Sequence, residues 1–455
     1  MDLSAVVKAY DVRGIVPDQL DESVARALGA AFVDVVGAER IVTAHDMRET
    51  GPGLARAFAD GALHRGASVV EVGLASTDLL YFASGHLQLP GAMFTASHNP
   101  AVYNGIKLCR AGAQAVGRDT GLAEVRAAAE RYLDDGLPPA GSPGTVEQAD
   151  LLADYARHLR GLVDLTGIRP LKIVVDAGNG MAGYTVPAVL GDAELPALPL
   201  EIVPLYFDLD GSFPNHEANP LEPANLRDLQ ERVVTEGADL GLAFDGDADR
   251  CFVIDSAGAA VSPSAITCLV AVRELRRAPG APVIHNLITS KAVPEVIREH
   301  GGQPVRTQVG HSTIKAEMAR TGAIFGGEHS AHYYFRDFWF ADTGLLAAMH
   351  VLAELGAASG RLDELVEPYA RYVASGEINS SVADAADRLA EVRERFGADA
   401  TSVDELDGLT VGLPDGSWFN VRASNTEPLL RLNVEAQTPQ AMAELRDAVL
   451  DVIRR

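Results

Sequence analysis

The stretch Asp239-Leu-Gly-Leu-Ala-Phe-Asp-Gly-Asp-Ala-Asp-Arg250 joins a short apolar run to a loop in which carboxylates alternate with small residues. A short apolar run bounded by turn residues is typical of a buried strand in an α/β sheet. The alternating carboxylates, Asp245, Asp247 and Asp249, repel one another unless a cation lies between them. Hard oxygen ligands suit Mg²⁺, so the stretch predicts an α/β sheet with a metal site at the end of one strand.

This acidic loop has two alternative interpretations, a calcium-binding EF-hand and a solvated turn. An EF-hand loop that starts at Asp245 would place Gly at its sixth position and Glu at its twelfth. Those positions hold Arg250 and Ser256, so a calcium hand fits poorly. A solvated acidic turn remains open on this motif alone.

Short apolar runs alternate with helical patterns on both sides of the acidic loop, which is typical of α/β units with mainly parallel sheets. The runs lie at 40–45, 68–72, 91–95, 171–176, 283–285, 304–306 and 323–325. A segment rich in Pro and Gly at 135–144 predicts a linker. Beyond residue 369 the pattern changes to a hairpin signal at 414–417 and an amphipathic helix at 439–453.

These changes of pattern predict four domains, which are three α/β units of similar length and a smaller C-terminal α+β unit. The expected bounds are 1–144, 145–253, 254–368 and 369–455. Ligand sites commonly lie where domains meet, so a central cleft is expected between the four units.

The composition excludes several classes of function. The chain has 455 residues and a formal charge of −25, which argues against a nucleic-acid binder. No apolar run is long enough to span a membrane, and the N-terminus lacks the pattern of a secretory signal. The scattered cysteines Cys109, Cys251 and Cys268 predict free thiols and a cytoplasmic location. An anionic substrate would have to be held by a local cluster of cations and backbone N–H groups.

A second motif, Thr95-Ala-Ser-His-Asn-Pro100, follows an apolar run and therefore forms a loop at a strand end. Ser97 is a candidate nucleophile, and His98 adjoins it. The flanking residues do not form the G-x-S-x-G elbow of hydrolases. A turn in which the hydroxyls bond their own backbone is the alternative.

Two further loops carry polar side chains suited to a sugar phosphate. Arg422-Ala-Ser-Asn-Thr-Glu-Pro428, with Arg431 just beyond, offers an oxyanion cradle, although a polar turn is the alternative. In Gly326-Gly-Glu-His-Ser-Ala-His332, Glu328 can accept hydrogen bonds from sugar hydroxyls, and Ser330 and the histidines can add donors. Zinc ligation by Glu328, His329 and His332 is a rival interpretation that lacks a zinc signature.

Three shorter segments add support, although each taken singly also fits a structural role. Tyr10-Asp-Val-Arg-Gly14 offers Arg13 to a phosphate, and Asn104-Gly-Ile-Lys107 follows the serine loop closely. Val309-Gly-His-Ser312 opens a predicted helix, where N–H groups and His311 could face an anion.

Together these motifs resemble the α-D-phosphohexomutase family, and most closely its bacterial phosphomannomutase/phosphoglucomutase branch. They occur in the family's order from Tyr10 to about Arg431, which is nearly the whole chain. The resemblance implies an α/β fold around a central active-site cleft. Its first three domains would share a topology with mixed, mainly parallel sheets and would carry the serine, metal and sugar loops in that order. The smaller α+β domain would carry the phosphate loop.

The resemblance also implies a role for each motif residue. Ser97 would be the serine that is phosphorylated in the active enzyme, and an oxygen of its phosphate would join Asp245, Asp247 and Asp249 as ligands of one Mg²⁺ per site. His98 would lie beside the nucleophile and Arg250 beside the metal, while Lys107 and His311 would act as general acid or base. The residues that would bind the substrate are Tyr10 and Arg13, with Glu328, Ser330 and His332 at the sugar. The residues that would surround the distal phosphate are Arg422, Ser424, Asn425, Thr426 and Arg431.

The implied reaction is reversible phosphoryl transfer between the 1- and 6-positions of mannose or glucose phosphate. Phosphoserine would give its phosphoryl group to the free hydroxyl, and the resulting hexose 1,6-bisphosphate would turn in the cleft and return its other phosphate to Ser97. Free bisphosphate would act as an activator. Because a phosphoserine carries a charge of about −1.5 to −2, three carboxylates beside it require the metal. The expected partner is the hexose phosphate, with no nucleic acid or membrane, and the expected assembly is a monomer or a homodimer.

Three other functions stay open from the sequence. They are a phosphoglucosamine mutase, a magnesium-dependent sugar phosphatase and a sugar-phosphate binder without activity.

Two departures from related mutases bear on the preferred sugar. His329 stands where relatives often have Met or Gln, and Lys291 lies later in its segment than the lysine that several relatives place there.

Overall fold

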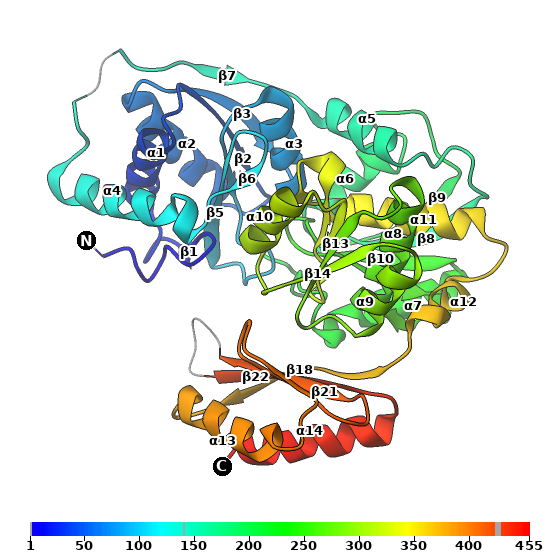
Figure 1. The fold of residues 1–455 in the computed structure, drawn as a ribbon. Coiled ribbons are helices and arrows are strands. Elements are labelled where there is room, and N and C mark those ends of the chain that lie inside the picture. Colours follow the sequence, from blue (N-terminus) through cyan, green and yellow to red (C-terminus); the bar gives the residue numbers. More distant parts are fainter. Residues whose placement is uncertain (1, 140–141, 424–428) are drawn as a thin grey trace.

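The computed structural model describes residues 2–139, 142–423 and 429–455, and these residues form four β-sheets in chain order. Figure 1 shows the four sheets and their helices, with the C-terminal unit set apart from the other three. The four-domain α/β architecture expected from the sequence is therefore confirmed. In the described part of the chain no helix is both long and apolar enough to cross a membrane.

The first sheet has the order β1-β5-β4-β2-β3-β7, and β6 extends it beside β5. Its strands are β1 (Val12–Ile15), β2 (Arg40–His45), β3 (Ser68–Leu74), β4 (Gly91–Phe94), β5 (Tyr103–Arg110), β6 (Gln114–Ala115) and β7 (Val146–Gln148). Strands β4, β2, β3 and β7 run parallel, whereas β5 is antiparallel to both β4 and β1. Helices α1 (Glu22–Val36), α2 (Gly51–His64) and α4 (Leu122–Asp135) pack on one face, and α3 (Thr77–Leu87) packs on the other.

The second and third sheets repeat one plan, in which parallel strands lead into an antiparallel hairpin. The second sheet contains β8 (Leu171–Asp176), β9 (Leu200–Leu205), β10 (Leu240–Phe244), β11 (Cys251–Asp255) and β12 (Ala260–Val261). The third contains β13 (Pro282–Asn286), β14 (Gln303–Thr307), β15 (Phe325–Gly327), β16 (Tyr333–Phe335) and β17 (Ala341–Asp342). Their helices are α5 (Leu152–Leu162), α6 (Ala182–Val189), α7 (Arg227–Glu236), α8 (Pro263–Arg277), α9 (Ala292–Glu299), α10 (His311–Thr321), α11 (Gly344–Ala357) and α12 (Leu362–Val366).

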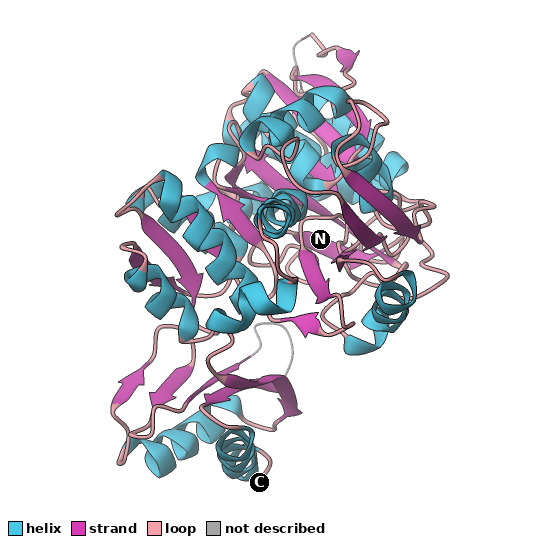
Figure 2. Ribbon diagram, turned by 90° about the vertical axis from the view of Figure 1, so that its right-hand side faces the viewer, coloured by secondary structure: helices cyan, strands magenta, loops and turns pink. Residues whose placement is uncertain are grey.

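The fourth sheet is antiparallel and has helices on one side only, as Figure 2 shows. It contains β18 (Val373–Ser381), β19 (Ser402–Asp404), β20 (Leu409–Gly412), β21 (Trp418–Ala423) and β22 (Leu429–Ala436), covered by α13 (Ala385–Gly397) and α14 (Pro439–Ile453). The hairpin expected around 414–417 joins β20 to β21, and the final helix has the expected bounds. The open face of this sheet is turned toward the other three units (Figure 1).

Two of the expected domain bounds lie within sheets. Strand β7 follows residue 144 but pairs with β3 of the first sheet, and β11 crosses residue 253 before it pairs with β12. The first sheet therefore continues to Gln148 and the second to Val261. Strand β7 is exposed along its length, so it carries no apolar signal that the sequence could reveal.

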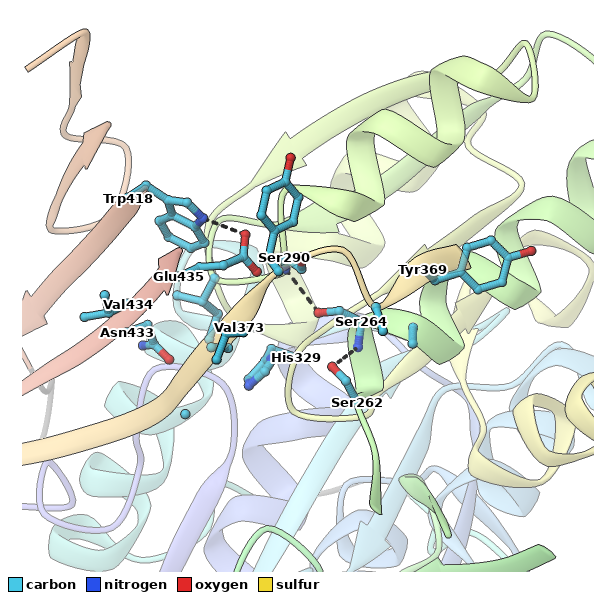
Figure 3. Close-up of a pocket in the computed structure, with 16 residues that line it drawn as sticks. Ser262, Ser264, Ser290, His329, Tyr369, Val373, Trp418, Asn433, Val434 and Glu435 are labelled. Carbon is cyan, nitrogen blue, oxygen red and sulfur yellow. Dashed lines mark hydrogen bonds between the residues drawn. The ribbon is translucent and has the colours of Figure 1, made fainter. Parts of the chain in front are cut away.

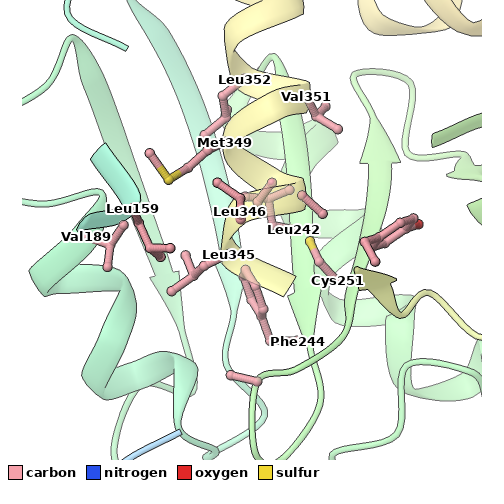
Figure 4. Packing of buried hydrophobic residues seen from close by; sticks show 14 of the residues in the cluster. Leu159, Val189, Leu242, Phe244, Cys251, Leu345, Leu346, Met349, Val351 and Leu352 are labelled. Atoms are coloured by element: carbon pink, nitrogen blue, oxygen red, sulfur yellow. The ribbon is translucent and has the colours of Figure 1, made fainter. Parts of the chain in front are cut away.

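One apolar core joins the second unit to α3 of the first unit and to much of the third, whereas the opposite face of the first sheet and a small part of the third unit have cores of their own. Helix α11 follows the strands of the third sheet in the chain, yet its Leu345, Leu346 and Met349 pack against Leu242 and Phe244 of β10 (Figure 4). Its first residue, Gly344, touches the acidic loop, because an added Cβ would lie 2.7 Å from the carbonyl oxygen of Arg250. The position of the acidic loop thus depends on the third unit as well as the second.

A buried carboxylate, Asp78, ties the three units together at the start of α3. It accepts hydrogen bonds from Ser76 beside it, from the Tyr155 hydroxyl of α5 at 2.7 Å and from the Thr343 hydroxyl before α11 at 2.7 Å. Burial raises the pKa of Asp78 to about 6. The three hydrogen bonds act in the opposite direction but do not cancel the effect of burial. The ionised form therefore costs stability at neutral pH.

We expect Asp78→Asn to change how stability depends on pH. A folded-state pKa of about 6 lies above the unfolded value of 3.8, so the wild type loses stability as pH rises from about 4 to about 6. The variant lacks this loss, and its thermal midpoint relative to wild type should rise over that range by the equivalent of roughly 3 kcal/mol. Thermal unfolding in metal-free buffer measures the difference, with exposed Asp192→Asn as the control for a lost charge. A difference that stays constant with pH would contradict the assignment.

Candidate functional site

Three topologically equivalent loops form the centre of the candidate site. In each of the first three sheets one loop joins the last parallel strand to the first antiparallel strand, as β4 to β5, β10 to β11 and β15 to β16. These loops contain the serine, the three aspartates and Glu328, respectively. Because such loops leave the carboxyl ends of parallel strands, their side chains can meet in one place.

Ser97 lies in the first loop and is buried, with a positive φ of 49°. Its hydroxyl donates a hydrogen bond of 2.7 Å to Asp245 and accepts one of 3.2 Å from Arg250. Its backbone N–H donates to the Thr95 hydroxyl at 2.9 Å. The structure therefore brings the predicted nucleophile into direct contact with the predicted metal loop.

The backbone of the serine loop is held by two arginines. Arg48 is almost fully buried, and it donates to the carbonyl oxygens of Ser97, Asn99, Pro100 and Tyr103 at 2.7–3.0 Å. Arg13 donates to the carbonyl oxygen of Ala96 and to the Asn99 side chain. Arg13 thus supports the loop, whereas the sequence suggested only a contact with phosphate.

Gly246 permits the serine loop to lie against the acidic loop. A Cβ at this position would come within 2.4 Å of the Ser97 carbonyl oxygen. The glycine between the first two aspartates therefore serves the close approach of two backbones, which the sequence could not reveal.

Asp245, Asp247 and Asp249 are all fully buried, and they can offer oxygen atoms that lie within 4.8 Å of one another. The ammonium of Lys107 contacts Asp247 and Asp249 at 2.6 Å each, and the Thr77 hydroxyl donates to Asp247 at 2.6 Å. One oxygen of Asp247 and one of Asp249 have no hydrogen-bond partner among the described residues. Two buried carboxylate oxygens beside Ser97 that accept no hydrogen bond fit a hard cation with oxygen ligands.

Burial and local charges shift the pKa values of this cluster in different directions. Burial raises the pKa of Asp245 even though Arg250 opposes it. Burial also acts to raise the pKa of Asp247, but the Lys107 ammonium, the Thr77 hydroxyl and Arg250 together outweigh it and lower that pKa. Burial alone would lower the pKa of Lys107, and the two aspartates raise it well above the ordinary value. Lys107 is therefore held as a cation, in competition with any metal for the same oxygens.

Arg250 links the acidic loop to the serine loop. It contacts Asp245 at 2.7 Å, and it donates to the Nδ1 of His98 as well as to Ser97. Burial, and then the charge of Arg250, lower the pKa of His98 well below its ordinary value. His98 is therefore neutral and accepts a hydrogen bond from Arg250.

The third loop centres on Glu328, which is almost fully buried. Its carboxylate accepts hydrogen bonds from the Asn286 amide at 3.1 Å and the Tyr334 hydroxyl at 2.9 Å. His332 bridges this loop to the metal loop, because its ring lies 3.0 Å from the Ser330 hydroxyl and 3.5 Å from Asp249. The loop is thus fixed in place beside the acidic cluster. Each carboxylate oxygen of Glu328 therefore already accepts a hydrogen bond from a neighbouring side chain.

Tyr10 and His311 meet at a junction of the first and third units. Their rings lie 5.6 Å apart in an edge-to-face arrangement. Burial raises the pKa of Tyr10, and Asp407 of the fourth unit adds to this rise. Burial lowers the pKa of His311 to about 3, so its imidazole is neutral near pH 7. A neutral imidazole can accept a proton, which fits the base half of the predicted acid-or-base role.

The predicted phosphate clamp is described only in part. Arg422 and Arg431 both contact Glu377 of β18, at 2.9 and 3.0 Å. Ser424, Asn425 and Thr426 lie outside the described residues.

Lys291 connects the third unit to the fourth. Its backbone N–H at the start of α9 donates to Glu435 at 2.9 Å, and its ammonium donates to the Gly416 carbonyl oxygen at 2.8 Å. The Trp418 indole donates to the same carboxylate at 2.8 Å (Figure 3). Lys291 thus connects the C-terminal unit to the third unit through both its backbone and its side chain.

A cavity of about 350 Å³ lies beside this connection, between the third and fourth units. His329 and Asn433 line it (Figure 3). The cavity places His329 on the side of the Glu328 loop that faces the C-terminal unit, next to the segment around Tyr372.

The sequence missed several residues that shape this site. Arg48 could have been found from the sequence. The segment Asp46-Met-Arg48 directly follows strand β2, in the same way as the serine, aspartate and Glu328 loops follow their strands. Thr77 and Asp78 carried no such signal, since their role depends on helix α3 reaching the acidic loop in space. Glu377 likewise lies in a strand that shows no motif.

Family models and relatives match nearly the whole chain. Four models match the chain in order, described as Phosphoglucomutase/phosphomannomutase alpha/beta/alpha domains I, II and III at residues 4–133, 153–258 and 262–372, and the C-terminal domain at 377–452. A phosphomannomutase from Escherichia coli is 39% identical over 439 residues, and the match covers 96% of each chain.

A second relative and a solved structure extend the comparison. The protein called phosphohexose mutases from Xanthomonas campestris pv. campestris is 42% identical over 446 residues, again 96% of each chain. A phosphoglucomutase/phosphomannomutase family protein from Burkholderia thailandensis has a crystal structure with a TM-score of 0.89 and 34% identity, and the match covers 99% of this chain and 97% of that chain. The chain therefore belongs to the phosphoglucomutase/phosphomannomutase family.

Proposed function

We propose that this protein is an isomerase that moves a phosphoryl group reversibly between the 1- and 6-positions of mannose or glucose phosphate. The proposed route passes through a phosphorylated Ser97 and a hexose 1,6-bisphosphate. The observation that carries the proposal is the contact of the Ser97 hydroxyl with Asp245 inside a buried cluster of three carboxylates. Family membership and relatives named phosphomannomutase support the same reaction.

The residues around Ser97 suit phosphoryl transfer, which depends on positioning and on neutralising charge. Asp245 accepts the hydroxyl proton of Ser97 in a hydrogen bond, and Arg250 donates to the same oxygen. Arg250 is therefore placed to stabilise negative charge on a group bound to that oxygen. Neutral His98 holds the Arg250 guanidinium in this position.

Asp245, Asp247 and Asp249 would hold one Mg²⁺ per site, together with an oxygen of the phosphorylated Ser97. When bound, the cation supplies charge neutralisation at the phosphoryl group. Lys107 has to leave two of these carboxylates for that purpose, because its ammonium occupies their oxygens. Once displaced, Lys107 would be free to act as a proton donor to the substrate.

The remaining predicted residues would bind the two ends of the substrate. Glu328, Ser330 and His332 would contact the sugar hydroxyls, with Tyr10 and Arg13 from the first unit nearby. Arg422 and Arg431, with Ser424, Asn425 and Thr426, would hold the phosphate that is not reacting. In this proposal each of the four domains contributes one loop to the site.

The wider setting of the protein follows from the same proposal. The expected partner is the hexose phosphate, and the functional unit would be a monomer or a homodimer that needs no nucleic acid or membrane. Hexose 1,6-bisphosphate would activate it by phosphorylating Ser97. The three buried, unpaired cysteines fit a cytoplasmic location.

We expect Ser97→Ala to abolish turnover, with a loss of at least about 10⁴-fold, because the phosphoryl acceptor is removed. Intact-mass measurement after incubation with glucose 1,6-bisphosphate should show one added phosphoryl group on wild type and none on the variant. The thermal midpoint of the variant should stay close to that of wild type. Full activity in this variant would exclude the phosphoserine route.

We expect Asp247→Asn to lower magnesium-dependent activity by at least about 100-fold, because it removes a charged ligand from the cluster. Activity measured over a range of Mg²⁺ concentrations checks this. The matched control is Asp239→Asn at the opposite end of β10, where the carboxylate pairs with Arg169 at 2.9 Å. An unchanged magnesium requirement in Asp247→Asn would refute the ligand assignment.

A substrate comparison tests the function itself. Turnover of mannose 1-phosphate and glucose 1-phosphate should exceed that of glucosamine 6-phosphate and should rise when glucose 1,6-bisphosphate is added. Preference for the amino sugar would instead indicate a phosphoglucosamine mutase. Release of free phosphate without need of a bisphosphate would indicate a phosphatase.

A further inference from the structure

Glu377 forms ion pairs with both arginines of the proposed phosphate clamp, Arg422 and Arg431. One of its carboxylate oxygens lies 2.9 Å from Arg422, and the other lies 3.0 Å from Arg431. Within the described residues it is the only carboxylate in an ion pair with either guanidinium. The clamp in this structure thus already holds an anion, and that anion belongs to the protein.

The strand register explains why an anion is needed at this place. Arg422 of β21 and Arg431 of β22 are direct cross-strand partners, and like charges at such positions destabilise a sheet. Glu377 lies on β18, the neighbour of β22 on its other side. Its single negative charge therefore relieves the repulsion between two arginines while the clamp holds no phosphate.

Glu377 uses only part of the hydrogen-bonding capacity of the clamp. Each arginine gives one terminal nitrogen to the carboxylate, out of five N–H donors. The Nε atoms of Arg422 and Arg431 are buried and lack a hydrogen-bond partner among the described residues. The arginines thus keep unpaired donors, and a phosphate dianion has more charge and more acceptors with which to replace the carboxylate.

We propose that Glu377 is an internal counter-anion that competes with the distal phosphate of the substrate for Arg422 and Arg431. This inference rests on the proposed mutase function. In that reaction the clamp must release one phosphate of the bisphosphate before the sugar can turn. Glu377 forms ion pairs with both arginines as the phosphate dissociates. The two facing guanidiniums therefore keep an anionic partner after release.

This competition lowers the affinity of the clamp for phosphate. A group that binds the empty clamp weakens phosphate binding by the strength of its own contacts and speeds phosphate release. Glu377 is about a quarter exposed, so its contacts resemble a partly screened ion pair. A factor of about five in substrate affinity corresponds to an interaction of that class.

Glu377→Gln tests the proposal, because it keeps the shape of the side chain and removes its charge. We expect KM for glucose 1-phosphate to fall about fivefold and kcat to fall by a similar factor, since the clamp releases the intermediate more slowly. Less free glucose 1,6-bisphosphate should escape during turnover. A higher KM with kcat unchanged would overturn the proposal, because it would mean that Glu377 helps phosphate to bind.

Two further variants keep the test decisive. Glu377→Asp retains the charge on a shorter side chain and should restore KM and kcat toward wild type, whereas values equal to those of Glu377→Gln would overturn the proposal. Glu391→Gln is the matched control, because this glutamate pairs with Arg388 on helix α13 at 2.7 Å and the helix covers the other face of the sheet. It should leave KM and kcat unchanged.

A wild-type protein without mutase activity would refute the proposed function. An active wild-type protein together with a higher KM in Glu377→Gln would refute only the role of Glu377.

Discussion

The burial of three carboxylates within five residues is the constraint on which the rest of this structure depends. Asp245, Asp247 and Asp249 are all at most 1% exposed, and ionised groups in such surroundings require partners. Lys107 and Arg250 supply positive charge, and Thr77 and Ser97 supply hydroxyl donors. Two oxygens still lack a hydrogen-bond partner within the described residues, which is the space that a divalent cation would fill.

The same constraint accounts for the way the units are joined. The partners of the three aspartates come from the first sheet and from helix α3, and the aspartate loop is supported from behind by α11. Asp78 connects these elements through hydroxyls of α5 and of the residue before α11. The core that joins the second unit to parts of the first and third thus supports the cluster from several sides, which suits a reaction that depends on position.

The C-terminal unit is attached in a different way. Polar contacts such as Lys291 with Glu435 and Arg306 with Asp404 join it to the third unit, and its own apolar core is separate. Contacts of this kind are typical of domains that move relative to each other. A clamp that moves, with Glu377 as its proposed counter-anion, would suit the proposed reaction, in which the intermediate must turn between two steps.

The sequence by itself determined the alternation of the main strands and helices and the residue types of each loop. Local apolar runs predicted β2, β8, β10 and the final helix, because burial of a strand or of one helix face leaves a periodic pattern. The motifs identified Ser97 and the three aspartates because alternating carboxylates need a cation wherever they are folded. The packing of α11 on the second sheet, the exposed strand β7 and the roles of Arg48, Thr77, Asp78 and Glu377 left no such pattern. Ser97 and Asp245 are 148 positions apart, and only the packing of one sheet against another brings them to hydrogen-bonding distance. Tertiary structure alone decided these contacts, since they join side chains from separate units whose local sequence carries no record of the partner.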